Sequence, residues 1–257
     1  MKRFSYFALL TLILLTACSS IPGLGATATP SPEPTLTFTP APTETPTPVP
    51  TATRDVIATI EAQKTQAAGD VLTELDKLKL DTDIEYRNGE LIWLGDEAEG
   101  VELSGPDGRY TPIDEKLTSS NFILQSDVTW QATGIIVCGV IFRSEPDLRE
   151  GKQYQFLFLR YSGLPAWAVE FHDFGYFKNS PTSVKYSSAV NQKNGSTNQV
   201  VLVAQDEKFT IYINGVRQGR FFDNSKQRMD GNFAFLGYQD SGEGSCKFEN
   251  SWIWELK

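Results

Sequence analysis

The spacing of apolar residues changes along the chain and divides it into four segments. Residues 1–17 contain one continuous apolar stretch, and residues 18–53 hold a Pro/Thr-rich tract with almost nothing apolar to bury. In residues 54–80 apolar side chains recur every three or four positions, which is the spacing of one helix face. From residue 81 to 257 short apolar runs alternate with turn residues about every ten positions, which predicts an all-β sandwich.

The sequence of the last segment also indicates how its strands face. FILQSDVTW (residues 122–130) alternates, with its apolar residues on one face. GIIVCGVIFR (residues 134–143) is apolar on both faces, which indicates a central strand. Asn88-Gly89 and Asn214-Gly215 each stand between strand-like pieces, so we expect a hairpin turn at each. About 175 residues are enough for one core of this kind.

The helical segment at residues 54–80 allows two interpretations. Thr53 can cap its start, and Asp55 suits the positive end of the helix dipole. The apolar positions form a short, imperfect heptad, which could oligomerise the protein as a coiled-coil stalk. Lys64 and Ala67 lie on that seam, so we favour the alternative, an amphipathic helix that packs against the next domain, or a frayed helix broken near Gly69.

The first segment has the pattern of a secretion signal. Lys2 and Arg3 precede an apolar stretch that is too short to cross a bilayer as a helix. Residues 15–18, Leu-Thr-Ala-Cys, resemble the bacterial lipobox, which implies cleavage before Cys18 and attachment of lipid to it. Several acyl chains would anchor the protein stably outside the cytoplasm, at the cell membrane or the outer envelope. The alternative is an ordinary secretory signal that contains Cys18 by chance.

The Pro/Thr tract and the net charge limit the partners. Residues 26–53 should form an extended, solvated spacer, because proline fixes φ and removes backbone donors. In polyproline II form this spacer would reach roughly 80 Å.

Residues 1–17 carry Lys2 and Arg3 but no acid, so their removal takes the net charge from -9 to -11. An acidic protein of this kind is not expected to bind nucleic acid or an anionic membrane surface.

Several of the predicted strands together resemble a known superfamily. In chain order they are NFILQSDVTW, CGVIFR, YQFLFLR, VVLVAQDEKFTIYINGVRQGRFFD and CKFENSWIWEL. They resemble the concanavalin A-like lectin/glucanase superfamily, and most of all its branch with 3-keto-disaccharide hydrolase-like domains and their non-catalytic relatives on bacterial surface proteins. The resemblance implies a jelly-roll β-sandwich over the end of the chain. Because this fold hosts lectins, glycosidases and plain interaction modules, it leaves the function open.

Two cysteines remain once Cys18 is assigned to lipid. An oxidising compartment favours a bond between Cys138 and Cys246. Each shares a strand face with apolar residues, so both should point into the core, on strands that such a jelly roll can bring together. We therefore predict a Cys138–Cys246 disulfide, with two buried free thiols as the alternative. Two separated cysteines and one histidine do not make a zinc site.

Candidate catalytic chemistry centres on His172, the only histidine, in VEFHDF. On a strand Glu170 and His172 share one face, which could be an acid/base pair, a metal pair or simply a polar outer face. Glycosidases of the superfamily resemble one another in a strand that carries acids at alternate positions, and this chain has no such run. We therefore predict no enzyme activity. A hydrolase of the 3-keto-disaccharide type would have to use Glu170, His172 and Asp173.

For a ligand, residues 161–186 are the expected aromatic platform. Trp167 and Phe171 alternate with polar residues and should be core, whereas Tyr176 and Tyr186 lie in turn-rich sequence. Two arginines end their strands and could hydrogen-bond a glycan, or could be strand-end charges only. The candidate ligand-binding residues are Arg143, Arg160, Glu170, His172, Tyr176 and Tyr186.

Together these features predict a lipid-anchored, extracytoplasmic surface protein whose non-catalytic β-sandwich binds glycan. A glycan-processing hydrolase and a structural, protein-contact envelope protein are the alternatives. No cofactor is expected. The resemblance leaves calcium open, but neither SEPDLREG nor SGPDGR has the spacing of a dedicated calcium loop.

Overall fold

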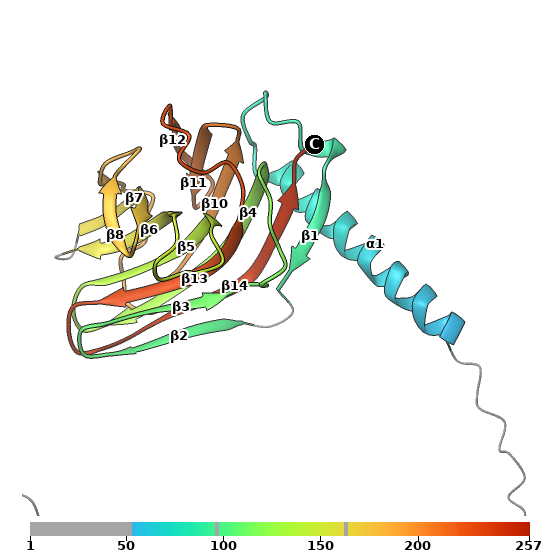
Figure 1. Cartoon of the computed structure of the whole chain (residues 1–257). Coiled ribbons are helices and arrows are strands. Elements are labelled where there is room, and N and C mark those ends of the chain that lie inside the picture. Colours follow the sequence, from blue (N-terminus) through green and yellow to red (C-terminus); the bar gives the residue numbers. More distant parts are fainter. Residues whose placement is uncertain (1–52, 96–97, 162–163) are drawn as a thin grey trace, which may run out of the picture. The chain divides into compact units, whose positions relative to one another are not determined.

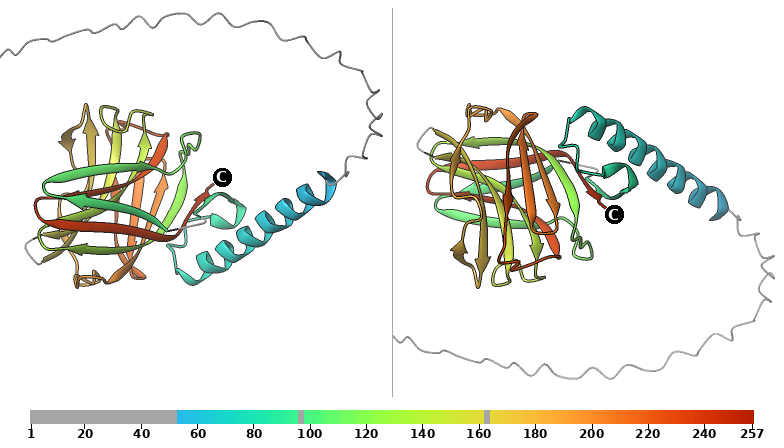
Figure 2. Two further views of the ribbon diagram at one scale, coloured as in Figure 1. Left: turned by 90° about the horizontal axis from the view of Figure 1, so that it is seen from below. Right: turned by 90° about the horizontal axis from the view of Figure 1, so that it is seen from above.

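The computed structural model describes residues 53–257 except 96–97 and 162–163. The predicted signal segment, Cys18 and the Pro/Thr tract lie outside the described residues. The described part is a sandwich of two antiparallel sheets with one long helix, α1 (Thr53–Lys77), against it (Figures 1 and 2). A 3-10 turn, η1 (Tyr86–Asn88), precedes the first strand. The predicted all-β jelly-roll sandwich behind a short helix is confirmed.

Each sheet has seven strands, and the chain passes repeatedly from one sheet to the other. In sheet A the order is β1-β14-β4-β10-β11-β12, with β2 also paired to β14; in sheet B it is β3-β13-β5-β6-β7-β8, with β9 paired to β7. Sheet A contains β1 (Glu90–Leu94), β2 (Glu99–Ser104), β4 (Phe122–Ala132), β10 (Thr197–Gln205), β11 (Lys208–Ile213), β12 (Val216–Phe222) and β14 (Glu243–Glu255). Sheet B contains β3 (Asp107–Pro112), β5 (Ile136–Ser144), β6 (Gln153–Tyr161), β7 (Leu164–Asp173), β8 (Tyr176–Asn179), β9 (Lys185–Tyr186) and β13 (Asn232–Gln239).

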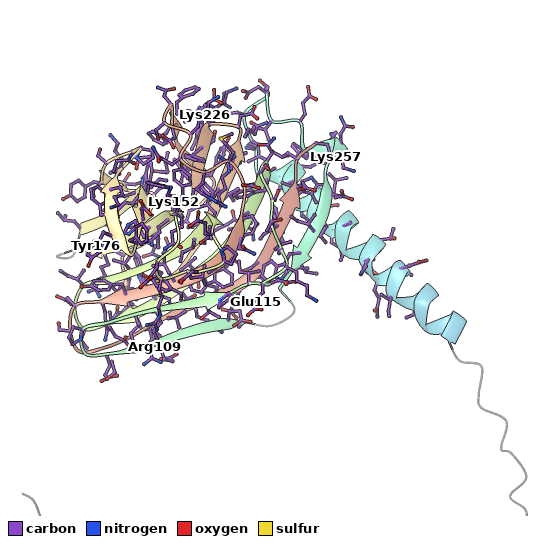
Figure 3. All side chains as sticks on the ribbon, viewed as in Figure 1. Arg109, Glu115, Lys152, Tyr176, Lys226 and Lys257 are labelled. Carbon is purple, nitrogen blue, oxygen red and sulfur yellow. A yellow bond between two sulfur atoms is a disulfide. The ribbon has the colours of Figure 1, made fainter. Side chains whose placement is uncertain are left out.

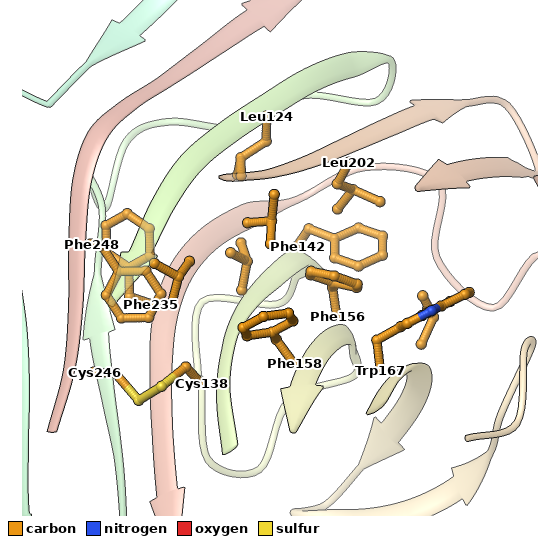
Figure 4. Close-up of a cluster of buried hydrophobic side chains, with 14 of the residues drawn as sticks. Leu124, Cys138, Phe142, Phe156, Phe158, Trp167, Leu202, Phe235, Cys246 and Phe248 are labelled. Atoms are coloured by element: carbon orange, nitrogen blue, oxygen red, sulfur yellow. A yellow bond between two sulfur atoms is a disulfide. The ribbon is translucent and has the colours of Figure 1, made fainter. Parts of the chain in front are cut away.

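The core lies between the two sheets and is rich in aromatic rings (Figure 4). As predicted, Phe122, Leu124, Val128 and Trp130 share one face and are buried in this core. Ile123 points to the other face, where it is buried in the cluster beneath α1. β5 is buried along its whole length between β13 and β6, which confirms the predicted central strand. The predicted disulfide is also present: Cys138 of β5 and Cys246 of β14 are bonded, with their Cα atoms 5.6 Å apart. It joins sheet B to sheet A across the core.

The two predicted Asn-Gly hairpins have different outcomes. Asn214 and Gly215 join β11 to β12 with positive φ at both positions, the conformation of a tight hairpin turn. The hairpin at Asn88-Gly89 is wrong, because β1 pairs with β14 at the other end of the chain. A Cβ on Gly89 would lie 2.2 Å from the carbonyl oxygen of Glu255. This glycine therefore permits a close approach of two strands rather than a turn.

Helix α1 covers part of the outer face of sheet A. Its C-terminal half buries Val71 and Leu75 against Trp252 and Trp254, and Leu78, directly after the helix, joins the same cluster. Ile60, about three turns before Val71 on the same seam, remains 46% exposed. The packing agrees with the favoured interpretation, an amphipathic helix that leans on the following domain, over the C-terminal half of the helix.

An ion-pair cluster fixes the segment that follows α1. Arg217 and Arg220 of β12 place their Nη2 atoms 2.8 and 3.0 Å from Asp81 Oδ2. Arg220 Nη1 lies 2.6 Å from Asp83 Oδ2. The Tyr212 hydroxyl accepts a hydrogen bond from the backbone N–H of Asp81, at 2.9 Å. These contacts, together with the apolar packing, hold α1 on sheet A.

The cluster should make the stability of the fold depend on pH. The hydrogen bonds from Arg220 hold the pKa of Asp83 below its usual range, against the opposing effect of burial. This stabilisation is present above the unfolded pKa of about 3.9 and is lost as the pH falls through the lower folded value. We expect Asp83→Asn to cost no more than about 1 kcal/mol of unfolding free energy at pH 7, because the pair is half exposed, and less at pH 2. Urea unfolding at both pH values measures this difference.

Glu85→Gln is the matched control, since Glu85 is an exposed carboxyl two residues further on with no ion pair among the described residues. An equal loss for Asp83→Asn at both pH values would contradict the prediction, and so would an effect of Glu85→Gln as large as that of Asp83→Asn.

Candidate functional site

The outer face of sheet B carries a groove, whereas α1 covers part of the outer face of sheet A. A strand sends alternate side chains to opposite faces, so core residues such as Val169 and Phe171 leave Glu170 and His172 on the outside. The groove has a volume of about 320 Å³, at the lower end for small-molecule sites. We call it the sheet B groove. It is lined by Gly108, Tyr110, Val137, Gln155, Leu157, Glu170, His172, Gly175, Leu236, Gly237 and Tyr238.

An acid and a base lie side by side in the sheet B groove. His172 Nε2 is 2.9 Å from Glu170 Oε2, and the two side chains are 16% and 21% exposed. No hydrogen bond or ion pair with a described residue involves the other carboxylate oxygen, Oε1. The prediction that Glu170 and His172 share one face is confirmed. One oxygen of the pair is left to accept a hydrogen bond from a ligand.

Gln155 adds an amide without a partner to the groove. It lies directly across from Glu170, on the neighbouring strand β6. Gln155 is only 6% exposed, yet its side chain makes no hydrogen bond with any described residue. Gln153, two residues earlier on the same face, donates to Leu148 O and accepts from Ser144 Oγ. The fully buried side-chain atoms that lack a partner among the described residues do not include the amide atoms of Gln155, so this amide faces the open groove, where a ligand or water can bond to it.

Aromatic rings stand at both edges of this face. Tyr110 of β3 and Tyr238 of β13 line the groove and are 38% and 49% exposed. At the other edge, Phe177 of β8 is the cross-strand neighbour of His172, with the two rings 6.1 Å apart. Tyr186 of β9 pairs with Ala166, which lies on the same face as Glu170. Rings beside a few polar groups form a surface that can stack on a ligand while the polar groups orient it.

The other predicted ligand-binding residues do not line the groove. Tyr176 is exposed at the outer end of the β7–β8 hairpin (Figure 3), but it pairs with Asp173, which is next to His172 and so on the opposite face. Arg160 donates to Ala132 O and to Asn194 Oδ1, at 3.1 and 2.9 Å, so it ties loops together. Asp173, the third residue of the hydrolase hypothesis, does not line the groove either.

Arg143 is fully buried and takes a structural position instead. Its Nε donates to Ser120 O at 3.0 Å, and its guanidinium lies 5.4 Å from the centre of the Phe209 ring. Burial lowers the pKa of Arg143 to about 10, although nearby acids such as Asp223 favour its charge. The Tyr154 hydroxyl, also buried, donates a hydrogen bond to Asp223, and burial together with this bond raises the pKa of Tyr154. Arg143 is therefore left out of the candidate site.

The residues that could hold a metal are few in the described part of the chain. Across residues 53–257, apart from the two gaps, no three His, Cys, Asp or Glu side chains gather as a metal site would require. The Glu170–His172 pair supplies two such groups and no third. In the same part of the chain, no helix is both long and apolar enough to cross a membrane.

The sequence interpretation missed three groove residues, namely Gln155, Tyr110 and Tyr238. Gln155 could have been found, because it is the lone polar residue in the outward positions of YQFLFLR, beside Leu157 and Leu159. The two tyrosines come from strands that are far apart in the sequence and become neighbours only through sheet pairing. No local pattern signals that meeting.

Comparison with known proteins gives a likeness of overall structure only. No family model matches the sequence, and no curated protein matches it either. A carbohydrate-binding module from Bacillus subtilis is similar with 16% identity and a TM-score of 0.45, over 59% of this chain and 84% of that one.

Two further solved structures belong to the same range of similarity. A legume lectin-like domain from Entamoeba histolytica has 13% identity and a TM-score of 0.43, over 62% of this chain and 84% of that one. A β-glucanase from Bacillus licheniformis has 10% identity and a TM-score of 0.42, over 62% and 78%. These are lectins and glucanases, the kinds of protein that the sequence resemblance names. At such identities and TM-scores the likeness says nothing about what this chain binds.

Proposed function

We propose that this chain is a non-catalytic glycan-binding protein, displayed outside the cell on a lipid anchor at Cys18, with the sheet B groove as its glycan site. The observation that carries the proposal is the unpaired amide of Gln155, which faces the groove next to a carboxylate with one vacant oxygen. Sugars present hydroxyl groups that both donate and accept, so they can satisfy both groups at once. The exposed rings of Tyr110 and Tyr238 would cover the apolar face of a sugar ring.

The chemistry of the groove also supports binding rather than hydrolysis. Most glycoside hydrolysis uses two carboxyl groups, one on each side of the scissile bond. Glu170 is the only carboxylate among the described residues that line the groove. A single carboxylate paired with a histidine is enough to orient a ligand. The disulfide between the sheets is consistent with the extracytoplasmic location that the proposal requires.

A glycan array followed by calorimetry on the full chain tests the proposal. We expect saturable binding to one class of glycan. Tyr238→Ala should weaken it by about 30-fold, as expected for an aromatic ring that stacks on the sugar, and Gln155→Ala by about tenfold. Phe222→Ala is the matched control. This ring lies on β12 of sheet A, and its exposed fraction of 53% is close to the 49% of Tyr238.

The proposal fails if a folded protein binds nothing on a broad array, or if binding survives both groove substitutions unchanged. Release of shorter sugars from a bound glycan, detected by chromatography, would replace it with the hydrolase alternative.

A further inference from the structure

We propose that the sheet B groove selects glycans that carry free amino groups, that is, cationic amino sugars, over neutral and acidic glycans. This inference rests on the proposed function and concerns the same groove. It follows from the charges in the groove and from how they are paired.

The described residues that line the groove contain no arginine and no lysine. Glu170 is its one acid and His172 its one imidazole base. The neighbouring arginine on β3, Arg109, alternates with Gly108 and Tyr110 and so faces the other side of the strand, where it pairs with Asp107 at 2.8 Å. A carboxylate or sulfate on a sugar would therefore meet a like charge at Glu170 without a cation to hold it.

Glu170 has fewer charged partners than an equally exposed acid elsewhere in the fold. Asp81 is a useful comparison, because its side chain is equally exposed, at 21%. Two guanidinium groups hold Asp81, whereas Glu170 has one contact, with His172 Nε2, and a vacant Oε1. A carboxylate partly removed from water is stabilised by an adjacent positive charge. In the groove, a ligand is the group that can supply it.

An ammonium group on a sugar fits this position. It carries three donors and no acceptor, which suits two acceptors close together. Glu170 Oε1 is one, and the amide oxygen of Gln155, directly across the strand pair, is the other. An N-acetyl group would replace this charge with a neutral amide, and a hydroxyl offers one donor only. The rings of Tyr110 and Tyr238 can stack on all these sugars alike, so the selection falls on the amine.

Calorimetry with four matched tetrasaccharides at pH 6.5 tests the inference on the full chain. The ligands are the β-1,4-linked tetramers of glucosamine, N-acetylglucosamine, glucose and glucuronate. We expect the glucosamine tetramer to bind about ten- to a hundredfold more tightly than the two neutral ones, as one charge-assisted hydrogen bond allows. We expect no binding of the glucuronate tetramer.

Two variants decide whether Glu170 is the cause. Glu170→Gln keeps the shape and should remove the preference for the amine, so that the affinity for the glucosamine tetramer falls to that for the neutral tetramers. Glu102→Gln, an exposed glutamate of β2 in sheet A, should change nothing. Equal affinity for amine and neutral tetramers, binding of the acidic tetramer, silence of all four or a preference that survives Glu170→Gln would each overturn the inference. Equal affinities would leave the proposed function intact, because that function is tested separately by the broad array and by the two groove substitutions.

Discussion

Replacing Cys138 and Cys246 together by alanine is expected to lower the free energy of unfolding by up to about 4 to 5 kcal/mol. The bond closes a loop of 108 residues, and a crosslink of that length restricts the unfolded chain strongly in the chain-entropy model. Both cysteines are fully buried between the sheets, so their removal also takes contacts from the core. Apart from the loss of one of the largest aromatic rings of the core, no single substitution is expected to cost as much as this double replacement.

Urea unfolding with and without a reducing agent separates the bond from the packing. The reducing agent should destabilise the wild-type protein by most of the same amount and leave the double variant unaffected. If reduction does not shift the urea midpoint of the wild-type protein while its thiols are shown to be free, the disulfide contributes little and the prediction is wrong.

The second large effect is expected at Asp223, which follows β12 directly and is buried together with Tyr154 and Arg143. Asp223→Ala removes the acceptor of the Tyr154 hydroxyl and one of the acids that favour the buried charge of Arg143. Loss of a partner in a buried polar cluster leaves groups that are neither hydrated nor paired, so we expect a loss of about 3 kcal/mol. Thermal unfolding followed by circular dichroism measures it.

Asp223→Asn is the matched variant, because an amide keeps an oxygen for Tyr154 and removes only the charge. It should cost less than half as much as Asp223→Ala. Equal losses for the two variants would mean that the charge, rather than the hydrogen bond, dominates. Neither variant should alter glycan binding, since Asp223 does not line the sheet B groove.

The features that could be predicted from the sequence are those set by local alternation. The inward direction of Cys138 and Cys246 follows from their apolar neighbours on the same strand face, and so does the burial of β5. Glu170 and His172 also share a face because a strand has a period of two residues. In each case the information lies within one strand.

The features that could not be predicted depend on pairings between distant segments. Gly89 follows an asparagine and looks like a turn, but the packing of Trp254, whose Nε1 donates to Tyr86 O at 2.8 Å, decides its role. Arg143 ends a strand and looks exposed, but a positive φ at this residue turns it toward Ser120 O and Phe209. The tyrosines of the groove meet only when β3 pairs with β13.

The position of the disulfide also matters for how the protein would bear a mechanical load. Helix α1, where the described chain begins, rests on sheet A (Figure 1). The groove lies on sheet B. A pull between residue 53 and a ligand held in the groove would therefore tend to shear one sheet past the other. The Cys138–Cys246 bond spans that plane, so the tension would pass through a covalent link as well as through packed side chains. With the proposed lipid anchor at Cys18 and the proposed ligand in the groove, the sandwich would act as a rigid coupling between the two under a flowing medium.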